Sequence, residues 1–327
     1  MLVDSLVVGI GGFWLTTLSL FGFRALAYRW RSLLREEVPL VGGIGIALSF
    51  TCLTFLGLFF FASIPPAVIG IIAASLLMLA FGICDDLFEL SVVAKFAVQL
   101  IAVSVLIFCG VKTRIIYIGG ALNIAVTFLW ILGITNAFNL LDILDGLAAS
   151  VALMISLGFF AIGMVGGDTH TMILSLSLAA AVSSFLVFNL PPAQMYMGNA
   201  GSHFLGFLLA AVAVFISYAP QEKPVALLSP LIILGLPIVD TAFLIVIRLL
   251  KKSLPFKKSN DHPALKLVAS GLSKPRALSL MCLMCLFFVS CGVILVKAPN
   301  AVGIVIAVLV ALASLWFGIA IARIKTV

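Results

Sequence analysis

The chain has 327 residues, of which 64% are hydrophobic and 9% are charged, and its formal net charge is +7. Soluble globular domains carry about 25% charged residues, so this composition excludes an ordinary soluble protein. About 20 consecutive apolar residues cross a bilayer, and the length is therefore counted in membrane spans.

Continuous apolar runs predict an all-α, polytopic membrane protein with a single domain over residues 1–327. The predicted spans cover residues 3–23, 41–62, 66–84, 92–110, 119–137, 147–165, 170–188, 202–218, 225–249, 277–296 and 300–322. This gives eleven helices, and ten is the alternative because some runs are short or hold polar residues. The first run lacks a basic segment before it and is predicted to be a retained span rather than a signal peptide.

The basic residues predict the orientation of these spans. With alternate loops assigned to one side, 15 of the 19 Lys and Arg residues fall together, and the other side holds only Lys112, Arg114, Lys223 and Lys297. The side that is rich in Lys and Arg is the cytoplasmic one. The N-terminus is therefore predicted outside and the C-terminus inside.

The acidic residues follow the same partition, which the rule for basic residues does not require. Nine of the twelve fall inside or at inner helix ends, and the exceptions are Asp4, Asp168 and Glu222. Loops hold charges anyway because the bilayer excludes them, and for Glu36 and Glu37 this explanation and a role in a site both stay open. Acids that adjoin apolar runs are costly and usually functional.

The first acidic motif is Asp85-Asp86, with Lys95 and Gln99 one turn apart on the next helix. Adjacent carboxylates at a helix end offer hard oxygen ligands for Mg²⁺, which combines a few carboxylates with phosphate oxygens and water. One of them can instead act as a base toward a phosphate or water. Helix capping is the structural alternative.

The second motif places polar residues at every third position, Asn136, Asn139, Asp142 and Asp145. On a helix this spacing predicts one slowly drifting polar face. A stripe of amides and carboxylates between two apolar spans indicates a site more than packing, although a hydrogen-bonded seam between helices is the alternative.

The third motif runs from Asn189 to Ser202 and includes Gly198, Asn199 and Gly201. Small residues directly before an apolar helix allow backbone N–H groups to approach a phosphate at the helix N-terminus. A plain loop followed by a helix cap accounts for the same residues.

The fourth region is a basic loop near residues 250–276 that contains His262 beside Asp261. Clustered Lys and Arg next to an inner leaflet ordinarily meet anionic lipid, and a lone loop histidine is usually solvated. His203 is attributed to helix packing and His170 to an ordinary loop. The Cys282-x-x-Cys285 spacing is attributed to packing, since no His or acid lies near it.

These motifs, in this order, resemble the polyprenyl-phosphate N-acetylhexosamine-1-phosphate transferases, the superfamily that includes the bacterial initiators of lipid-linked glycan synthesis. The resemblance covers nearly the whole chain. It rests on the segment Val38–Gly43, on the acidic and amide motifs above, on Pro237 and Asp240, and on His262.

The resemblance implies that polyprenyl phosphate attacks the β-phosphate of a UDP-N-acetylhexosamine and releases UMP, with Mg²⁺, or alternatively Mn²⁺, as cofactor. It implies that Asp85, Asp86 and Lys95 are catalytic and that Asp85, Asp86 and Asn199 bind the metal. Substrate binding is expected from Asn139, Asp142, Asp145, Asn189, Gly201, Ser202 and His262.

The chain departs from the family pattern in two places. The family has Asp where this chain has Asn199, and an amide oxygen can still coordinate Mg²⁺ but lacks the negative charge. The last loop normally holds several histidines, and here only His262 remains, with Ala264 and Leu265 at the other places.

Two further functions stay open from the sequence. A catalytically impaired family member that acts as a scaffold or partner in envelope glycan assembly is the first alternative, and a transporter or channel is the second. The enzyme interpretation places the protein in the bacterial inner membrane with its site facing the cytoplasm. Its partners are the donor, the lipid acceptor and the bilayer, with a homodimer as one arrangement and no nucleic acid.

Overall fold

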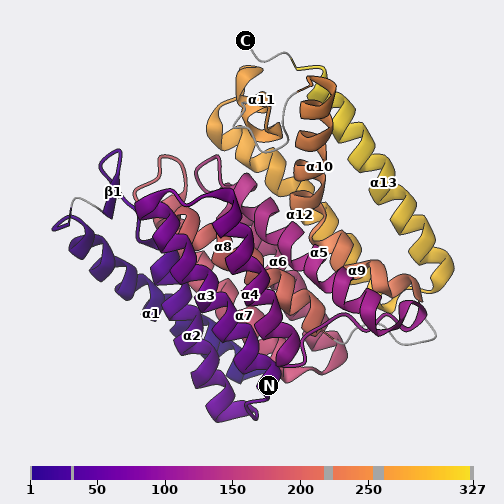
Figure 1. Cartoon of the computed structure of the whole chain (residues 1–327), viewed down its shortest axis with the longest axis horizontal. Helices are drawn as coiled ribbons and strands as arrows, with labels where there is room; N and C mark the ends of the chain where they lie inside the picture. Colours follow the sequence, from indigo (N-terminus) through magenta and orange to yellow (C-terminus); the bar gives the residue numbers. More distant parts are fainter. Residues whose placement is uncertain (1, 31–32, 217–223, 253–260, 325–327) are drawn as a thin grey trace.

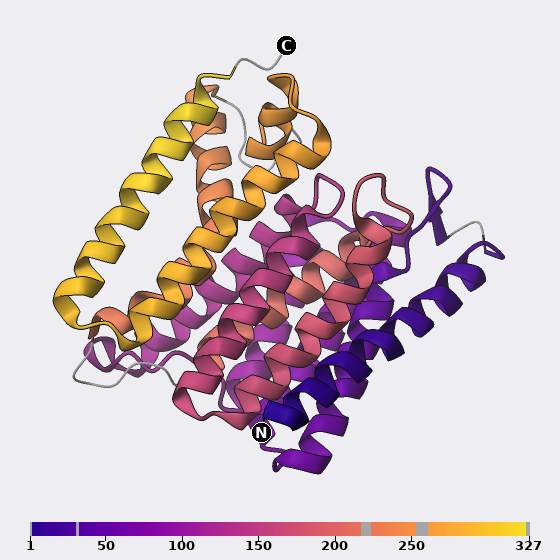
Figure 2. The ribbon, with the colours of Figure 1, turned by 180° about the vertical axis from the view of Figure 1, so that it is seen from behind.

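The computed structural model describes residues 2–30, 33–216, 224–252 and 261–324 and shows a bundle of long helices (Figures 1 and 2). The helices and strands are α1 (Leu2–Ala27), β1 (Leu34–Arg35), β2 (Val38–Pro39), α2 (Gly42–Phe61), α3 (Pro66–Phe88), α4 (Val92–Phe108), η2 (Ile116–Ile118), α5 (Gly119–Leu141), α6 (Leu147–Gly166), α7 (Thr169–Asn189), α8 (Gly198–Phe215), η3 (Pro224–Leu228), α9 (Ser229–Ile233), α10 (Gly235–Leu250), α11 (Pro263–Ala269), α12 (Lys274–Lys297) and α13 (Asn300–Ala322).

The polytopic, all-α prediction is confirmed. In the described part of the chain, nine helices are long and apolar enough to cross a membrane, and the bent segment Val225–Leu250 makes ten. The helix α4 is apolar but has only 17 residues. Each of the eleven predicted spans therefore has a counterpart. The only strands are β1 and β2, which form a two-stranded antiparallel hairpin among the described residues.

The predicted span over residues 225–249 is present but is not one continuous helix, because the chain bends by 72° between α9 and α10. The bend follows Leu234 and precedes Gly235 and Pro237. Proline has no N–H to continue the helical ladder, and glycine tolerates the break. Gly235 also packs against the ring of Phe288 on α12, where a Cβ atom would lie 2.8 Å from the ring.

Helix α8 lies in the interior of the bundle and packs against α2, α3 and α5. Its first turn fits between two other helices because glycines allow backbone contact. A Cβ atom on Gly43 of α2 would lie 2.3 Å from the backbone nitrogen of Gly201, and one on Gly82 of α3 would lie 2.4 Å from Cα of Ala200. Any side chain at either glycine would push α8 away.

The long helices run back and forth, so α1, α3, α5 and α7 end where α2, α4, α6 and α8 begin (Figures 1 and 2). We call this the site end of the bundle. The C-terminal end of α13 lies at the same level, whereas the N-terminus lies at the opposite end (Figure 1). Several residues of the predicted charge partition fall outside the described residues, namely Arg31, Glu222, Lys223, Lys257, Lys258 and Lys325, together with residues 253–260 of the basic loop.

Candidate active site at one end of the helix bundle

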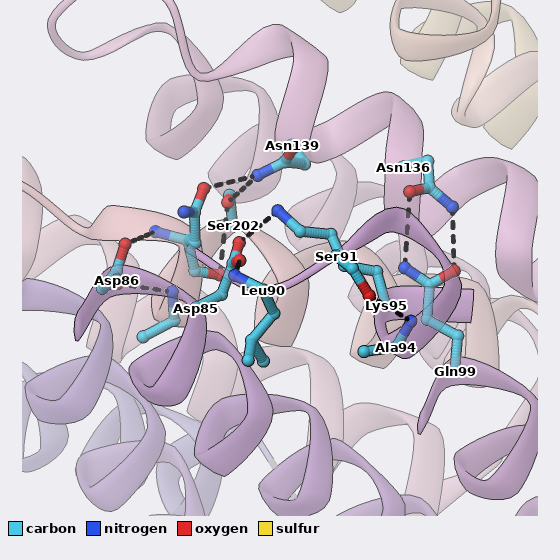
Figure 3. A network of polar contacts seen from close by, with 12 residues as sticks. Asp85, Asp86, Leu90, Ser91, Ala94, Lys95, Gln99, Asn136, Asn139 and Ser202 are labelled. Carbon is cyan, nitrogen blue, oxygen red and sulfur yellow. Dashed lines mark hydrogen bonds and ion pairs between the residues drawn. The ribbon is translucent and has the colours of Figure 1, made fainter. Parts of the chain in front are cut away.

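Helix α3 continues four residues beyond its predicted end and stops at Phe88, so Asp85 and Asp86 belong to its last turn. Glu89 ends the helix in the left-handed conformation with φ 45°. The two carboxylates point to different neighbours (Figure 3). The two acids therefore bind different partners and do not act together on one shared group.

Asp86 caps the first turn of α8. Its Oδ1 accepts from the backbone N–H of Asn199 at 2.9 Å, and its Oδ2 accepts from the N–H of Ala200 at 3.0 Å. Gly198 permits this approach, because its φ is +70° and a Cβ there would lie 2.5 Å from Oδ2 of Asp86. The N–H groups predicted to face a phosphate are thus held by a carboxylate, and a negative group is favourable at a helix N-terminus.

Asp85 is buried and holds the start of α4. Its Oδ2 accepts from Nζ of Lys95 at 2.5 Å, and its Oδ1 accepts from the backbone N–H of Leu90 at 2.9 Å. The Asp85 side chain is 1% exposed and that of Lys95 is 33% exposed, so the lysine alone reaches solvent. One turn on, Gln99 exchanges two amide hydrogen bonds with Asn136 of α5 (Figure 3).

Asn139 joins α5 to α8. Its Nδ2 donates to Oδ1 of Asn199 and to Oγ of Ser202, both at 3.0 Å (Figure 3). Asn199 lies in the same turn that Asp86 caps, so residues from three distant stretches of sequence meet here. The prediction that the polar motifs converge at one end of the bundle agrees with this arrangement.

The predicted single helical face from Asn136 to Asp145 is wrong. Helix α5 ends at Leu141, and Asp142 to Gly146 form the turn that reverses the chain into α6. Gly146, with φ +78°, allows this reversal. Only the two amides lie on the helix, and the two acids lie on the turn beyond it.

The turn acids lie beside the Asp86 cap. Asp142 is half-buried. Its burial and the nearby Asp86 and Asp145 carboxylates raise the pKa of Asp142 to about 7, although the positive charge of Arg35 lowers it. Asp145 accepts from the backbone N–H of Ala193 at 3.2 Å. Carboxylates therefore crowd this point with little positive charge to balance them.

Two predicted substrate-binding residues have structural roles. Asn189 is buried, and it accepts from the N–H of Gly146 at 3.0 Å and donates to the carbonyl of Met195 at 2.9 Å. It thereby joins the turn between α5 and α6 to the loop between α7 and α8. Gly201 provides the close approach of α8 to Gly43 of α2.

His262 lies apart from the Asp86 cap. It precedes α11, is 5% exposed, and its Nδ1 is 3.8 Å from Oδ2 of Asp240 on α10. That distance is too long for a hydrogen bond. Among the residues described, no hydrogen bond or ion pair joins His262 to Asp86, Asn139 or Asn199, and its predicted contact with a donor stays a prediction.

Arg35 is the site residue that the sequence reasoning did not single out. It lies on the hairpin β1–β2, and its charge acts on Asp86, Asp142 and Tyr196. The hairpin is joined to the α7–α8 loop, because the N–H of Tyr196 donates to the carbonyl of Pro39 at 2.9 Å. A basic residue shortly before the Gly42-Gly43 pair was the available signal.

The described residues contain no group of three His, Cys, Asp or Glu side chains arranged to hold a metal ion. Mg²⁺ nevertheless needs only one or two carboxylates when substrate phosphates and water complete its shell. Asp86 and Asp142 fit that requirement, since they are close enough to repel each other. Asp85 and Asn199, the other predicted ligands, are directed toward Lys95 and Asn139.

Comparisons with known proteins identify the family of this chain. The profile described as glycosyl transferase family 4 matches residues 68–217, which include α3 to α8 and most of the residues above. The chain is 35% identical to a probable undecaprenyl-phosphate N-acetylglucosaminyl 1-phosphate transferase of Bacillus subtilis, over 62% of this chain and 59% of the relative.

Two further relatives come from other lineages. A putative UDP-N-acetylglucosamine–dolichyl-phosphate N-acetylglucosaminephosphotransferase of Sulfolobus acidocaldarius is 33% identical over 56% of this chain and 60% of the relative. An undecaprenyl-phosphate α-N-acetylglucosaminyl 1-phosphate transferase of Thermotoga maritima is 32% identical over 69% of this chain and 67% of the relative. The chain thus matches about three fifths of the first two relatives and two thirds of the third. This multi-pass membrane protein belongs to glycosyl transferase family 4.

Proposed function

We propose that the protein transfers an N-acetylhexosamine 1-phosphate from a UDP-sugar to a polyprenyl phosphate and releases UMP. The observation that carries this proposal is the convergence of Asp86, Asn139 and Asn199 with the Asp85–Lys95 pair at one end of the bundle. A lipid acceptor requires a site at the membrane surface, and helix ends provide that position.

The relatives support both substrates. Their names specify undecaprenyl phosphate or dolichyl phosphate as the acceptor and N-acetylglucosamine 1-phosphate transfer as the reaction. One of the names also specifies UDP-N-acetylglucosamine as the donor. N-acetylglucosamine or a related N-acetylhexosamine is therefore the proposed sugar. The pathway it feeds is the synthesis of a lipid-linked envelope glycan.

Some residues of the site supply positive charge, and others hold the helices in position. Lys95 is the partly exposed cation that can turn toward a phosphate, and Arg35 supplies further positive charge that acts on Asp86 and Asp142. Asn139 and Ser202 hold the first turn of α8 in register with α5. Such fixed groups lower the cost of bringing two anions together.

Mg²⁺, bound by Asp86 and Asp142, would neutralise phosphate charge during the transfer. The Asp86, Asp142 and Asp145 carboxylates support this assignment, because their charges act on one another and a divalent cation would offset them. The proposal places the site on the cytoplasmic side of the bacterial inner membrane. Arg24 and Arg248 in the last turns of α1 and α10 support this orientation, because they lie at the site end.

The test uses purified protein with Mg²⁺, undecaprenyl phosphate and a panel of UDP-sugars, scored for UMP. We expect UMP release that requires both the lipid and one N-acetylhexosamine donor. A relative such as the Bacillus subtilis protein, assayed in parallel, shows that the lipid and detergent are suitable. If that control is active and this chain releases no UMP with any donor, the proposed activity is wrong.

A scaffold role is the second candidate, and one observation favours it. The Asn199 amide oxygen accepts from Asn139, and both Asp86 oxygens accept from α8, so the polar groups satisfy one another without a ligand. The same assay decides between the two functions. A scaffold would give no UMP even though the protein is folded, as measured by a cooperative thermal transition.

A further inference from the structure

His203 is a buried histidine that the proposed reaction does not use. It lies in α8 directly after Ser202 and is 2% exposed. Neither ring nitrogen has a hydrogen-bond partner. Burying an imidazole without partners is unfavourable, and a group that is left unpaired in a native interior requires an explanation.

The surroundings of His203 point toward Asp85. The imidazole stacks on Phe81 of α3, with ring centroids 5.3 Å apart and an angle of 26° between the planes. Phe81 lies one helical turn before Asp85 on the same face of α3. Asp85 and Lys95 are the charged groups near enough to act electrostatically on the ring.

Helix packing fixes the ring at this place. At the level of Gly82 and Ala200 the backbones of α3 and α8 are in contact, so the ring lies beside a close contact between the two helices. The carboxylate that acts electrostatically on the ring is that of Asp85, which makes it the candidate acceptor for an imidazole N–H.

Lys95 has two tasks that conflict. In the structure it pairs with Asp85, but the proposed transfer needs its charge on a phosphate. When the lysine leaves, the Asp85 carboxylate is a buried anion that keeps only the N–H of Leu90 as donor. A buried charge that loses its partner is strongly unfavourable, which would hold the lysine in place.

We propose that His203 is a positioning residue that serves as the reserve hydrogen-bond donor of Asp85 and thereby releases Lys95 for phosphate. A small rotation of the imidazole brings one N–H onto the carboxylate as the ammonium leaves. No proton is transferred, and the imidazole stays neutral. The part of this proposal that concerns phosphate rests on the proposed function, but the exchange of partners at Asp85 does not.

The test is a double-mutant cycle on thermal stability, with the variants Lys95→Met, His203→Phe and both together. Phenylalanine keeps the stacking on Phe81 and removes the unpaired nitrogens, so His203→Phe alone is expected to leave the unfolding midpoint unchanged or to raise it. In the Lys95→Met background the same change removes the reserve donor. There it is expected to lower the midpoint by roughly 2–4 °C.

Ser177→Ala is the matched control, because Ser177 is a buried hydroxyl on α7 without a hydrogen-bond partner. Its effect should be equal in both backgrounds. If His203→Phe also shifts the midpoint equally in both backgrounds, His203 is not the reserve partner and the proposal is wrong. This result does not depend on any enzymatic activity.

The activity arm adds a second readout. His203→Phe is expected to lower the turnover number about tenfold, as for other groups that orient a reacting residue, whereas His203→Gln keeps a donor and should recover most of it. Equal losses in the two variants would contradict the proposed donor role. If the wild-type protein releases no UMP at all, the proposed function fails and the stability cycle still decides the role of His203.

Discussion

Two polar regions lie at the site end of the bundle, and they differ in how far the protein satisfies them. Around Asp85 and Asp86 each carboxylate oxygen accepts a hydrogen bond from a backbone N–H or from Lys95. Around Asp240 neither carboxylate oxygen has a hydrogen-bond partner, and Nδ1 of His262 is also unpaired. All four oxygens of Asp85 and Asp86 are therefore satisfied within the protein, and the two oxygens of Asp240 are not.

This difference separates groups that already have their hydrogen-bond partners from groups that would gain a partner through a conformational change or a bound ligand. Fixed hydrogen bonds hold Asp86 and Asn199 in place, which would favour the proposed reaction. The unpaired oxygens of Asp240 carry a desolvation penalty that a bound group or a closer His262 would relieve. We therefore expect mutations in the first region to have larger effects than mutations in the second.

The largest effect is expected from Asp86→Ala. The substitution removes the acceptor for two backbone N–H groups of α8, and loss of such a cap costs about 1 kcal/mol of stability. Because Asp86 is also a proposed metal ligand, UMP release should fall by roughly 100-fold or more. Thermal unfolding and the UMP assay measure the two effects separately.

Asp168→Ala is the matched control for that prediction. Asp168 caps α7 at the opposite end of the bundle, where its Oδ1 accepts from the N–H of His170 at 3.1 Å. It should lower stability by a similar amount and leave the activity of the folded protein unchanged. Equal losses of activity in the two variants would show that Asp86 acts only as a cap.

The second prediction compares two Lys–Asp pairs. Lys95→Met leaves the buried Asp85 without its ion-pair partner, whereas Lys251→Met breaks a pair at 2.6 Å whose lysine is 54% exposed. Exposed pairs contribute about 0–1 kcal/mol. The stability loss in urea or heat should therefore be larger for Lys95→Met, and a larger loss for Lys251→Met would reverse the ranking of the two regions.

The sequence predicted the spans and the convergence of the motifs, because both follow from apolar periodicity and charge placement. It did not predict which groups pair. Asp86 and Asn199 are separated by more than a hundred residues, and their contact depends on the glycines that bring α8 against α3. Arg35 was missed for the same reason, since a hairpin rather than a helix carries it to the site.

A smaller effect is expected from Asp240→Asn. Neither oxygen has a hydrogen bond to lose, so stability should stay within about 1 kcal/mol of the wild-type value. If His262 contacts the donor, the substitution should raise the KM for the UDP-sugar without changing kcat, as for a loss of uniform binding. A change in kcat alone would place this region in the reaction rather than in donor binding.

The smallest predicted effect is the pH dependence that Asp142 contributes. Its pKa of about 7 in the folded protein lies above the ordinary value of 3.8, so the native state binds a proton that the unfolded chain releases. The contribution of this group to stability is therefore greatest at low pH and declines as pH rises from about 4 to 7.

Mg²⁺ competes with that proton for the Asp142 carboxylate, and at pH 8 the carboxylate is already ionised. The rise in unfolding midpoint on adding Mg²⁺ should accordingly be larger at pH 8 than at pH 6, by roughly 2 °C. In Asp142→Asn the difference between the two pH values should disappear, and its persistence would assign the metal to other carboxylates.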